Sequence, residues 1–273
     1  MTQFFGVFAI YLVGSLVLTI AFLVAWARNF AETRQFMHAG LAVVGTFLIT
    51  DIFLLWLAGL DAVDRSAASV IATEAMTAVR LYAYTVVGLL LSQRLNDACA
   101  ETGQPTAYGL SKLTGNTLSY ALLATAFMAL FSVVLFLLTK PTIGAFFQSP
   151  EALSTEVSFP VLIAVSAIAF AEEITFRLGL QNGLTYLARG SRYGHHWAVL
   201  VTTAFWTIAH VGSLEPDWVK FVQVFAFGLV LGHMNRRLGI VPCIVTHVLF
   251  NILMVFVSAE LVRYGVISVG GTP

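Results

Sequence analysis

Residues 159–187 read FPVLIAVSAIAFAEEITFRLGLQNGLTYL, a long apolar stretch with three ionisable side chains near its middle. A helix needs about 20 mostly apolar residues to cross a bilayer, and this stretch is long enough. In such a helix Glu172, Glu173 and Arg177 each cost about 2.5–3.5 kcal/mol unless they face protein or water. The stretch therefore predicts a membrane helix that carries a polar site.

The composition of the whole chain is typical of a membrane protein. Of its 273 residues, 59% are hydrophobic and 10% are charged, whereas a soluble domain carries about 25% charged residues. The formal net charge is zero and there is no basic block, which excludes nucleic acid as a partner. Cys99 and Cys243 are too few for a disulfide framework. We expect both to be free, with Cys99 in a loop and Cys243 at the start of a helix.

Further apolar runs lie on both sides of this stretch. None shows the alternating ten-residue pattern of a membrane β-barrel, so helices are the expected spanning elements. We predict an all-α polytopic membrane protein with about eight transmembrane helices, the last four forming a C-terminal core. The predicted helices cover residues 4–27, 39–60, 68–91, 117–139, 159–187, 197–213, 219–236 and 240–262. The first run exceeds the apolar core of a signal peptide and lacks a basic segment before it, so we expect it to be retained.

The distribution of Lys and Arg between the connections predicts the orientation, because cytosolic loops carry an excess of them. One side of the membrane would hold Arg28, Arg34, Arg94, Lys112, Arg189, Arg192, Arg236 and Arg237. The other side would hold Arg65, Lys140, Lys220 and Arg263, together with most of the loop acids. We therefore predict that both termini face away from the cytosol.

The Glu pair of helix 159–187 offers two differently placed carboxylates. Glu173 and Arg177 are four residues apart and can pair on one face. Glu172 lies about 100° further round the helix and faces other neighbours. A poorly solvated carboxylate of this kind suits a general base or acid. The alternative is an ion-pair cluster that only locks helices together.

Polar side chains recur in the later helices. His210 follows Trp206 by four residues, and His247 and Asn251 share one face of the last helix. These residues could line a cavity, or they could make an interfacial contact and interhelical hydrogen bonds. His247 would lie about 10 Å into its helix, whereas His210 is near the far end of helix 197–213. We expect that helix to stop within the membrane, so that both histidines reach one depth.

Other intramembrane polar residues have simpler structural interpretations. Asp51, Glu74 and Arg80 would form a charge network between the second and third helices. His233 is expected to serve packing or to lie at the interface at the basic end of its helix, and the pair 195–196 is expected to be solvated at the interface.

Three motifs occur in order on separate late helices: Glu-Glu-x-x-x-Arg from Glu172, aromatic-x-x-x-His from Trp206, and His-x-x-x-Asn from His247. Their order resembles the CPBP-type intramembrane proteases, the family of CAAX prenyl-protein endopeptidases and bacteriocin-processing and immunity proteins. The resemblance runs from about residue 160 to 253. It departs from the family at Trp206, where phenylalanine is usual, and at His233, where an aromatic residue such as tyrosine is expected. It divides the chain into 1–140, which has no placed motif, and a catalytic core at 159–262.

The resemblance implies roles for the polar residues. Glu172 and His210 would activate a water molecule for attack on a peptide carbonyl, and Asn251 with His247 would donate hydrogen bonds to the oxyanion. Glu173 belongs to the same catalytic group, with Arg177 as its partner orienting the Glu pair. Trp206 would support the site. No cofactor is favoured. If zinc is used, its ligands would be Glu172, His210 and His247.

The expected function is endopeptidase cleavage inside the membrane. The partners would be membrane lipid and a peptide or membrane-protein substrate, cut at a leader or C-terminal segment, in the cytoplasmic membrane of a bacterium. A non-catalytic scaffold or immunity protein of the same fold is the first alternative. An ion-coupled transporter is the second, because intramembrane Glu and His also mark relays, but no internal repeat typical of transporters is visible.

Overall fold

The computed structural model describes residues 2–58, 67–101, 108–111, 113–144 and 157–269. Two predicted features lie outside these residues. One is the connection with Asp61, Asp64 and Arg65, and the other is most of the soft boundary at 140–158, which includes Glu151 and Glu156.

Each of the eight apolar runs predicted from the sequence corresponds to a helical element. Their bounds are α1 Thr2–Arg28, α3 Met37–Ala58, α4 Ala67–Glu101, α5 Gly115–Thr139, α6 Phe159–Glu172 continued by η4 Glu173–Gln181 and α7 Asn182–Leu187, α8 Gly194–Ile208, α9 Asp217–Leu238 and α10 Ile240–Arg263. Two short turns, α2 Phe30–Thr33 and η1 Arg34–Phe36, join α1 to α3. In the described part of the chain, five stretches are long and apolar enough to cross a membrane, and 13–28 is a shorter apolar helix. The protein is therefore an all-α membrane protein, and the number of eight crossings stays a prediction.

The third predicted helix is longer than expected. It was predicted to end at residue 91, but α4 continues to Glu101. Tertiary contacts support the extension: Arg94 forms a 2.7 Å ion pair with Glu32, and the Asn96 side chain bonds both backbone groups of Tyr108. The placement of Cys99 in a loop was therefore wrong. Helix propensity and hydropathy indicate where the apolar run ends, but they do not indicate the tertiary contacts that extend the helix. Cys243 lies at the start of α10 and is free, as predicted.

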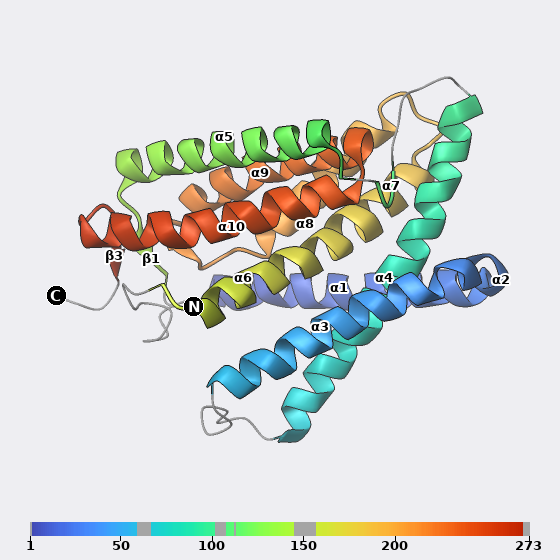
Figure 1. Ribbon diagram of the computed structural model, residues 1–273, viewed down its shortest axis with the longest axis horizontal. Coiled ribbons are helices and arrows are strands. Elements are labelled where there is room, and N and C mark those ends of the chain that lie inside the picture. The colour runs from blue at the N-terminus through green and yellow to red at the C-terminus, as the bar shows by residue number, and fades with distance from the viewer. Residues whose placement is uncertain (1, 59–66, 102–107, 112, 145–156, 270–273) are drawn as a thin grey trace.

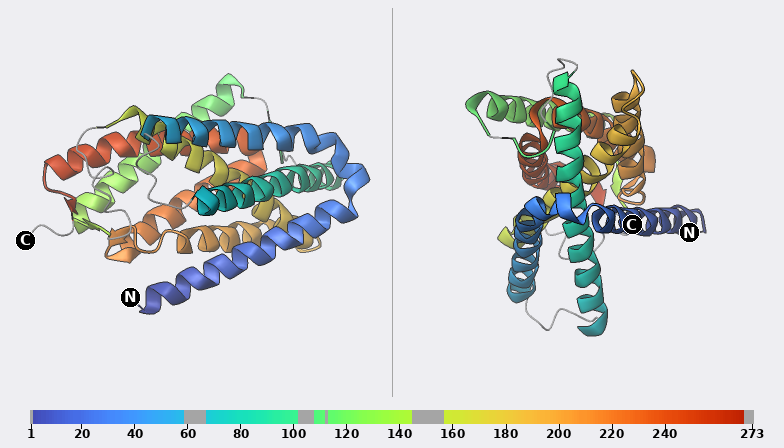
Figure 2. Two further views of the ribbon diagram at one scale, coloured as in Figure 1. Left: turned by 90° about the horizontal axis from the view of Figure 1, so that it is seen from below. Right: turned by 90° about the vertical axis from the view of Figure 1, so that its right-hand side faces the viewer.

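The late helices form a bundle around α10. Helices α5, α9 and α10 run side by side, and α6 packs against α10 (Figures 1 and 2). Helix α8 packs on α9, whereas the long α4 crosses the molecule and packs against η4 and α3. The bundle thus receives helices from both halves of the chain.

A small sheet closes one end of the bundle. It is formed by β1 Thr142–Ile143, β2 Leu214–Glu215 and β3 Ser268–Val269, in the order β2-β1-β3. β1 pairs antiparallel with β2 and parallel with β3. The start of α1 and the end of α10 lie at this same end (Figure 1). The sheet was not predicted, because strands of two residues show no periodicity in the sequence.

Close helix contacts in the bundle depend on glycine. A Cβ atom at Gly228 of α9 would lie 2.6 Å from Thr203 Cγ2 and 3.1 Å from the Trp206 ring on α8. A Cβ at Gly232, one turn later, would lie 2.7 Å from Val199. Small residues four apart let two membrane helices approach closely. This contact fixes α8, and with it the segment that carries His210.

The helix that carries the Glu pair changes its winding at the site. After Glu172 the α-helix becomes a π-helix from Glu173 to Gln181. π-Turns release backbone carbonyls from their usual partners and are frequent at functional sites. Here the Asn235 amide donates to the Arg177 carbonyl at 3.3 Å and to Asn182 Oδ1 at 2.9 Å. Asn182 in turn donates to Ser92 Oγ at 2.8 Å, so this buried network ties α9 to α4 through the irregular segment.

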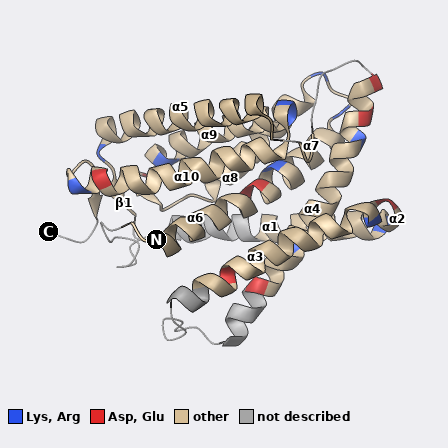
Figure 3. Ribbon diagram, viewed as in Figure 1, with Lys and Arg blue, Asp and Glu red and all other residues tan. Residues whose placement is uncertain are grey.

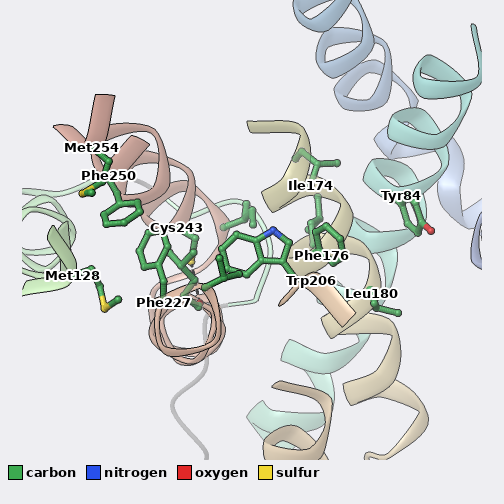
Figure 4. Close-up of a cluster of buried hydrophobic side chains, with 14 of the residues drawn as sticks. Tyr84, Met128, Ile174, Phe176, Leu180, Trp206, Phe227, Cys243, Phe250 and Met254 are labelled. Atoms are coloured by element: carbon green, nitrogen blue, oxygen red, sulfur yellow. Dashed lines mark hydrogen bonds between the residues drawn. The ribbon is translucent and has the colours of Figure 1, made fainter. Parts of the chain in front are cut away.

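The core between these helices centres on Trp206, which is 2% exposed. Its ring lies between Phe227 and the α10 side chains on one side and Ile174 and Phe176 on the other (Figure 4). The apolar core therefore lies around the helix segments that carry the predicted site residues.

Candidate active site

Glu172 faces two imidazoles from two other helices. Its Oε2 lies 3.6 Å from His247 Nε2, and its Oε1 lies 4.0 Å from His210 Nε2. The His247 side chain is 3% exposed, whereas those of Glu172 and His210 are 23% and 19% exposed. The carboxylate and both rings therefore meet in a partly enclosed space.

Second partners fix the tautomer of each ring. His210 Nδ1 lies 2.9 Å from the Trp206 carbonyl, which can only accept, so Nδ1 carries the proton. His247 Nδ1 lies 2.9 Å from Glu173 Oε1 and likewise donates. In the neutral rings both Nε2 lone pairs are therefore directed toward Glu172. A molecule that donates hydrogen bonds to these nitrogens, such as water, fits between them.

Glu173 has two partners. Besides holding His247, it places Oε2 3.7 Å from Arg177 Nε, and both side chains of this pair are at most 1% exposed. The i, i+4 pairing with Arg177 was predicted. The bond to His247 was not, because spacing within one helix says nothing of a residue 74 positions away.

Trp206 contacts both imidazoles of the site. Its ring centroid lies 5.2 Å from that of His210 and 5.3 Å from that of His247, both edge-on. The Arg177 guanidinium lies 5.0 Å from the same ring, in a cation–π contact. Tryptophan in place of the usual phenylalanine thus gives both imidazoles and the arginine a common packing surface.

Asn251 lines the same space, and one of its two amide N–H groups is engaged. Its Nδ2 donates to the Val165 carbonyl of α6 at 3.2 Å. It shares one face of α10 with His247, as predicted, and links α10 to α6. The second N–H can donate to a substrate while this bond is kept.

The polar residues border a cavity of about 510 Å³. Its walls are mostly apolar side chains from α6, α10 and the three-stranded sheet. Glu172, His210, His247 and Asn251 all line it, and so do Lys220 and Gln223 from the first turns of α9. Neither Lys220 nor Gln223 was predicted as a site residue, and Lys220 was counted only as a charge of its connection. Because the two residues are three apart in a predicted helix, their spacing could have indicated that they share one face.

His210 reaches this cavity because α8 is short. The helix ends at Ile208, two residues before the histidine. At 1.5 Å per residue its 15 residues span about 22 Å, less than the roughly 30 Å of a hydrocarbon core. The chain then returns through β2 into α9. The predicted helix end at residue 213 was therefore too late, and a stop within the membrane stays a prediction.

The predicted zinc ligands are Glu172, His210 and His247. A tetrahedral zinc ion with bonds of about 2.1 Å brings its ligand atoms about 3.4 Å apart. The Glu172 oxygens lie 3.6 Å from His247 Nε2 and 4.0 Å from His210 Nε2. Within the described residues, no group of three or more His, Cys, Asp or Glu is arranged to hold a metal ion. Whether the site uses a metal stays a prediction.

Most other charged residues lie outside the bundle centre, which holds only a few of them (Figure 3). Glu74 hydrogen-bonds Asp51, which links α4 to α3 as the predicted network requires. Both side chains are outside the cavity.

A second histidine cluster lies at the opposite end of α9. The rings of His195, His196 and His233 have centroids 5.7–5.9 Å apart. The prediction that His195 is solvated was wrong: the residue is 8% exposed and contacts the Tyr108 hydroxyl at 3.3 Å. Burial raises the pKa of Tyr108, in the connection after α4, to about 12. His196 and His233 are exposed, as expected for that interface.

Comparison with known proteins gives two matches and one negative result. Residues 154–253 match the family model of type II CAAX prenyl endopeptidase Rce1-like proteins. A segment of 59 residues is 27% identical to the sporulation-killing factor biosynthesis protein SkfC of Bacillus subtilis (strain 168), covering 21% of this chain and 12% of that protein. No solved structure matches. The resemblance drawn from the three motifs is thereby confirmed for this segment.

Proposed function

Because residues 154–253 are an Rce1-like segment, we propose that this membrane protein is an endopeptidase that hydrolyses a peptide bond of a membrane-associated peptide or protein. One observation carries the proposal. Glu172 faces the Nε2 atoms of His210 and His247 within a partly enclosed cavity. All three residues fall inside the family segment.

The first step is attack by water. A water molecule between Glu172 and His210 donates one proton to the carboxylate while its oxygen attacks the substrate carbonyl carbon. Glu172 is held beside a largely apolar wall, where few water molecules compete for it. His210, fixed by its bond to the Trp206 carbonyl, orients the attacking water through Nε2.

The tetrahedral intermediate then needs a partner for its oxyanion. His247, which takes a proton from solvent at Nε2 and returns it when the products leave, donates a hydrogen bond there, and Glu173 on Nδ1 holds the ring in place and balances its charge. Asn251 offers a second donor through the amide N–H that does not bond the Val165 carbonyl. Glu172 finally returns its proton to the leaving nitrogen as the C–N bond breaks, which releases a carboxylic acid, ionised in solvent, and an amine.

A scaffold of the same fold is the competing function. A scaffold requires packed side chains, which Glu173, Arg177 and Trp206 provide. It does not require a carboxylate that faces the lone pairs of two imidazole nitrogens. Glu172 has no hydrogen bond that would hold α6 to another helix among those of the described residues. Its position is therefore better suited to chemistry than to structure.

The test is hydrolysis measured with labelled water. Purified protein in detergent is incubated with heat-inactivated membrane proteins in H₂¹⁸O, and new peptide C-termini are analysed by mass spectrometry. We expect ¹⁸O in new carboxylates with wild type and with the control Glu260→Gln, which alters an exposed pair with Arg263. Glu172→Gln should release no labelled peptide and should melt at the wild-type temperature. Equal labelling by Glu172→Gln, or none by wild type, would refute the proposal.

A further inference from the structure

The π-segment η4, which begins at Glu173, affects the direction of the two adjacent glutamates. A turn closed by i→i+5 bonds holds one residue more than an α-turn, whose bonds run i→i+4. If the segment were α-helical and α7 kept its place, α6 would turn by about 100° for each surplus residue. One such turn would put Glu173 where Glu172 lies, and Ile174 where Glu173 lies. The winding therefore assigns the exposed and the buried position to the two carboxylates.

Side chains of α9 and α4 hold this winding. Asn235 of α9 is fully buried, and its Nδ2 donates to the Arg177 carbonyl within η4 and to Asn182 Oδ1 directly after it. Asn182 Nδ2 donates to Ser92 Oγ at 2.8 Å, and Ser92 Oγ donates to the Gly88 carbonyl of its own helix α4 at 2.6 Å. Loss of one of these side chains leaves a buried partner without its hydrogen bond, which is costly. The network therefore stabilises the π-segment against other windings.

The backbone of α4 fits closely against the same segment. A Cβ atom at Gly88 would lie 2.6 Å from the Leu178 carbonyl oxygen. In the opposite direction, a Cβ at Gly179 would lie 2.5 Å from the Tyr84 ring. Each helix thus has a glycine where the other approaches it. A change of winding would move Leu178 and Gly179 out of this contact, so α4 supports the π-segment by packing as well as by hydrogen bonding.

We propose that Ser92, Asn182 and Asn235 are positioning residues that hold the π-segment. Through its backbone they turn Glu172 toward the cavity and keep Glu173 in the buried position. None of the three is among the described residues that line the cavity. Ser92 lies outside residues 154–253, so the N-terminal half of the chain takes part in the site. The direction of the carboxylates can be measured without hydrolysis, and only the effect on rate rests on the proposed endopeptidase function.

The experiment measures which side chains reach the cavity. In a background with Cys99→Ala and Cys243→Ala, Glu172→Cys reports on the direction of α6. Ser258→Cys, on the α10 wall of the same cavity, reports on whether the cavity stays open. Each purified single-cysteine protein is labelled in detergent with a small water-soluble methanethiosulfonate, and the labelling rate is followed by mass spectrometry. Both positions should be labelled when the network is intact.

The network is then broken in both reporter proteins. Asn235→Leu keeps the volume but removes two hydrogen bonds, and should slow labelling at position 172 about tenfold. Ser92→Ala should give a smaller loss in the same direction. Thr85→Val is the matched control, since this buried hydroxyl of α4 donates only within its own helix, to the Leu81 carbonyl at 2.7 Å. It should change neither rate, and labelling at position 258 should stay unchanged in all variants.

Two results of the labelling would overturn the proposal. One is an unchanged rate at position 172 in Ser92→Ala, which decides the matter even if Asn235→Leu does not fold. The other is an equal loss at positions 172 and 258, because the network would then only hold the cavity open.

Hydrolysis tests the consequence for the proposed reaction. With Glu172 restored, Ser92→Ala should lower kcat in the ¹⁸O experiment and leave KM almost unchanged, whereas Thr85→Val should hydrolyse as wild type. An unchanged kcat in Ser92→Ala would contradict the positioning role. Slower labelling at position 172 without any hydrolysis by wild type would support the positioning of the carboxylate and overturn only the endopeptidase function.

Discussion

The Glu173 side chain is 1% exposed and is shared by a histidine and an arginine. A buried carboxylate with two such partners carries structure and chemistry together. Removing one member of a buried ion pair leaves the other charge without compensation, which is more costly than the pair was worth.

Glu173→Gln is therefore expected to destabilise the protein by about 3–5 kcal/mol, because Arg177 loses its counter-charge. Thermal melting in detergent measures this loss, with Glu172→Gln as the matched control that should melt as wild type. Replacing both partners, as Glu173→Gln with Arg177→Met, should restore part of the lost stability. A double variant whose loss equals the sum of the single losses would show that the two residues are not coupled.

Trp206 offers a second test at this scale. Trp206→Ala should cost about 3–5 kcal/mol and abolish hydrolysis, because both imidazoles and Arg177 lose their packing surface. Trp206→Phe keeps an aromatic ring between the imidazoles and should retain hydrolysis with a smaller loss of stability. Thermal melting measures the loss of stability, and the ¹⁸O experiment measures the loss of hydrolysis. The idea fails if the alanine variant stays as stable and active as wild type.

At the scale of elements, the close approach of α8 and α9 positions His210. Gly228→Ala places a methyl group against Thr203 and Trp206 and should cost about 1–3 kcal/mol through overpacking. Gly45→Ala is the matched control, since a Cβ there meets no atom within 4 Å. That change should be neutral or slightly stabilising, because alanine favours helix. The melting temperatures of both variants test this prediction. Equal shifts in the two variants would contradict the conclusion that α8 and α9 are closely packed at Gly228.

The elements also show which features a sequence can reveal. The eight helical runs and the three motifs were readable because apolar length and ionisable side chains in an apolar run are local signals. The π-turn after Glu172, the extension of α4 to Glu101 and the bond between Glu173 and His247 depend on partners distant in the chain. Lys220 was missed for a related reason. Near a helix end it looks like any interfacial lysine until the surrounding walls are known.

At the scale of the whole molecule, the orientation in the membrane remains a prediction. Cysteines at positions 2 and 272, in a background with Cys99→Ala and Cys243→Ala, should react with an impermeant maleimide in intact spheroplasts. Arg192→Cys, in the exposed connection between α7 and α8, is the control that should react only after lysis. We expect this connection to face the cytosol because it is rich in arginine. Labelling of both termini only after lysis would reverse the orientation.

The buried bonds to α4 and α5 affect any attempt to transplant the segment that carries the candidate site. Residues 154–253 contain the motif side chains, but Ser132 holds Gln223, and Ser92 holds Asn182 beside the π-turn. A chimera that grafts only this segment onto another membrane protein would carry the motif side chains, but two buried amides would lack a partner. A segment that can be transferred to another protein therefore has to include α4 and α5. It is considerably longer than the stretch that sequence comparison detects.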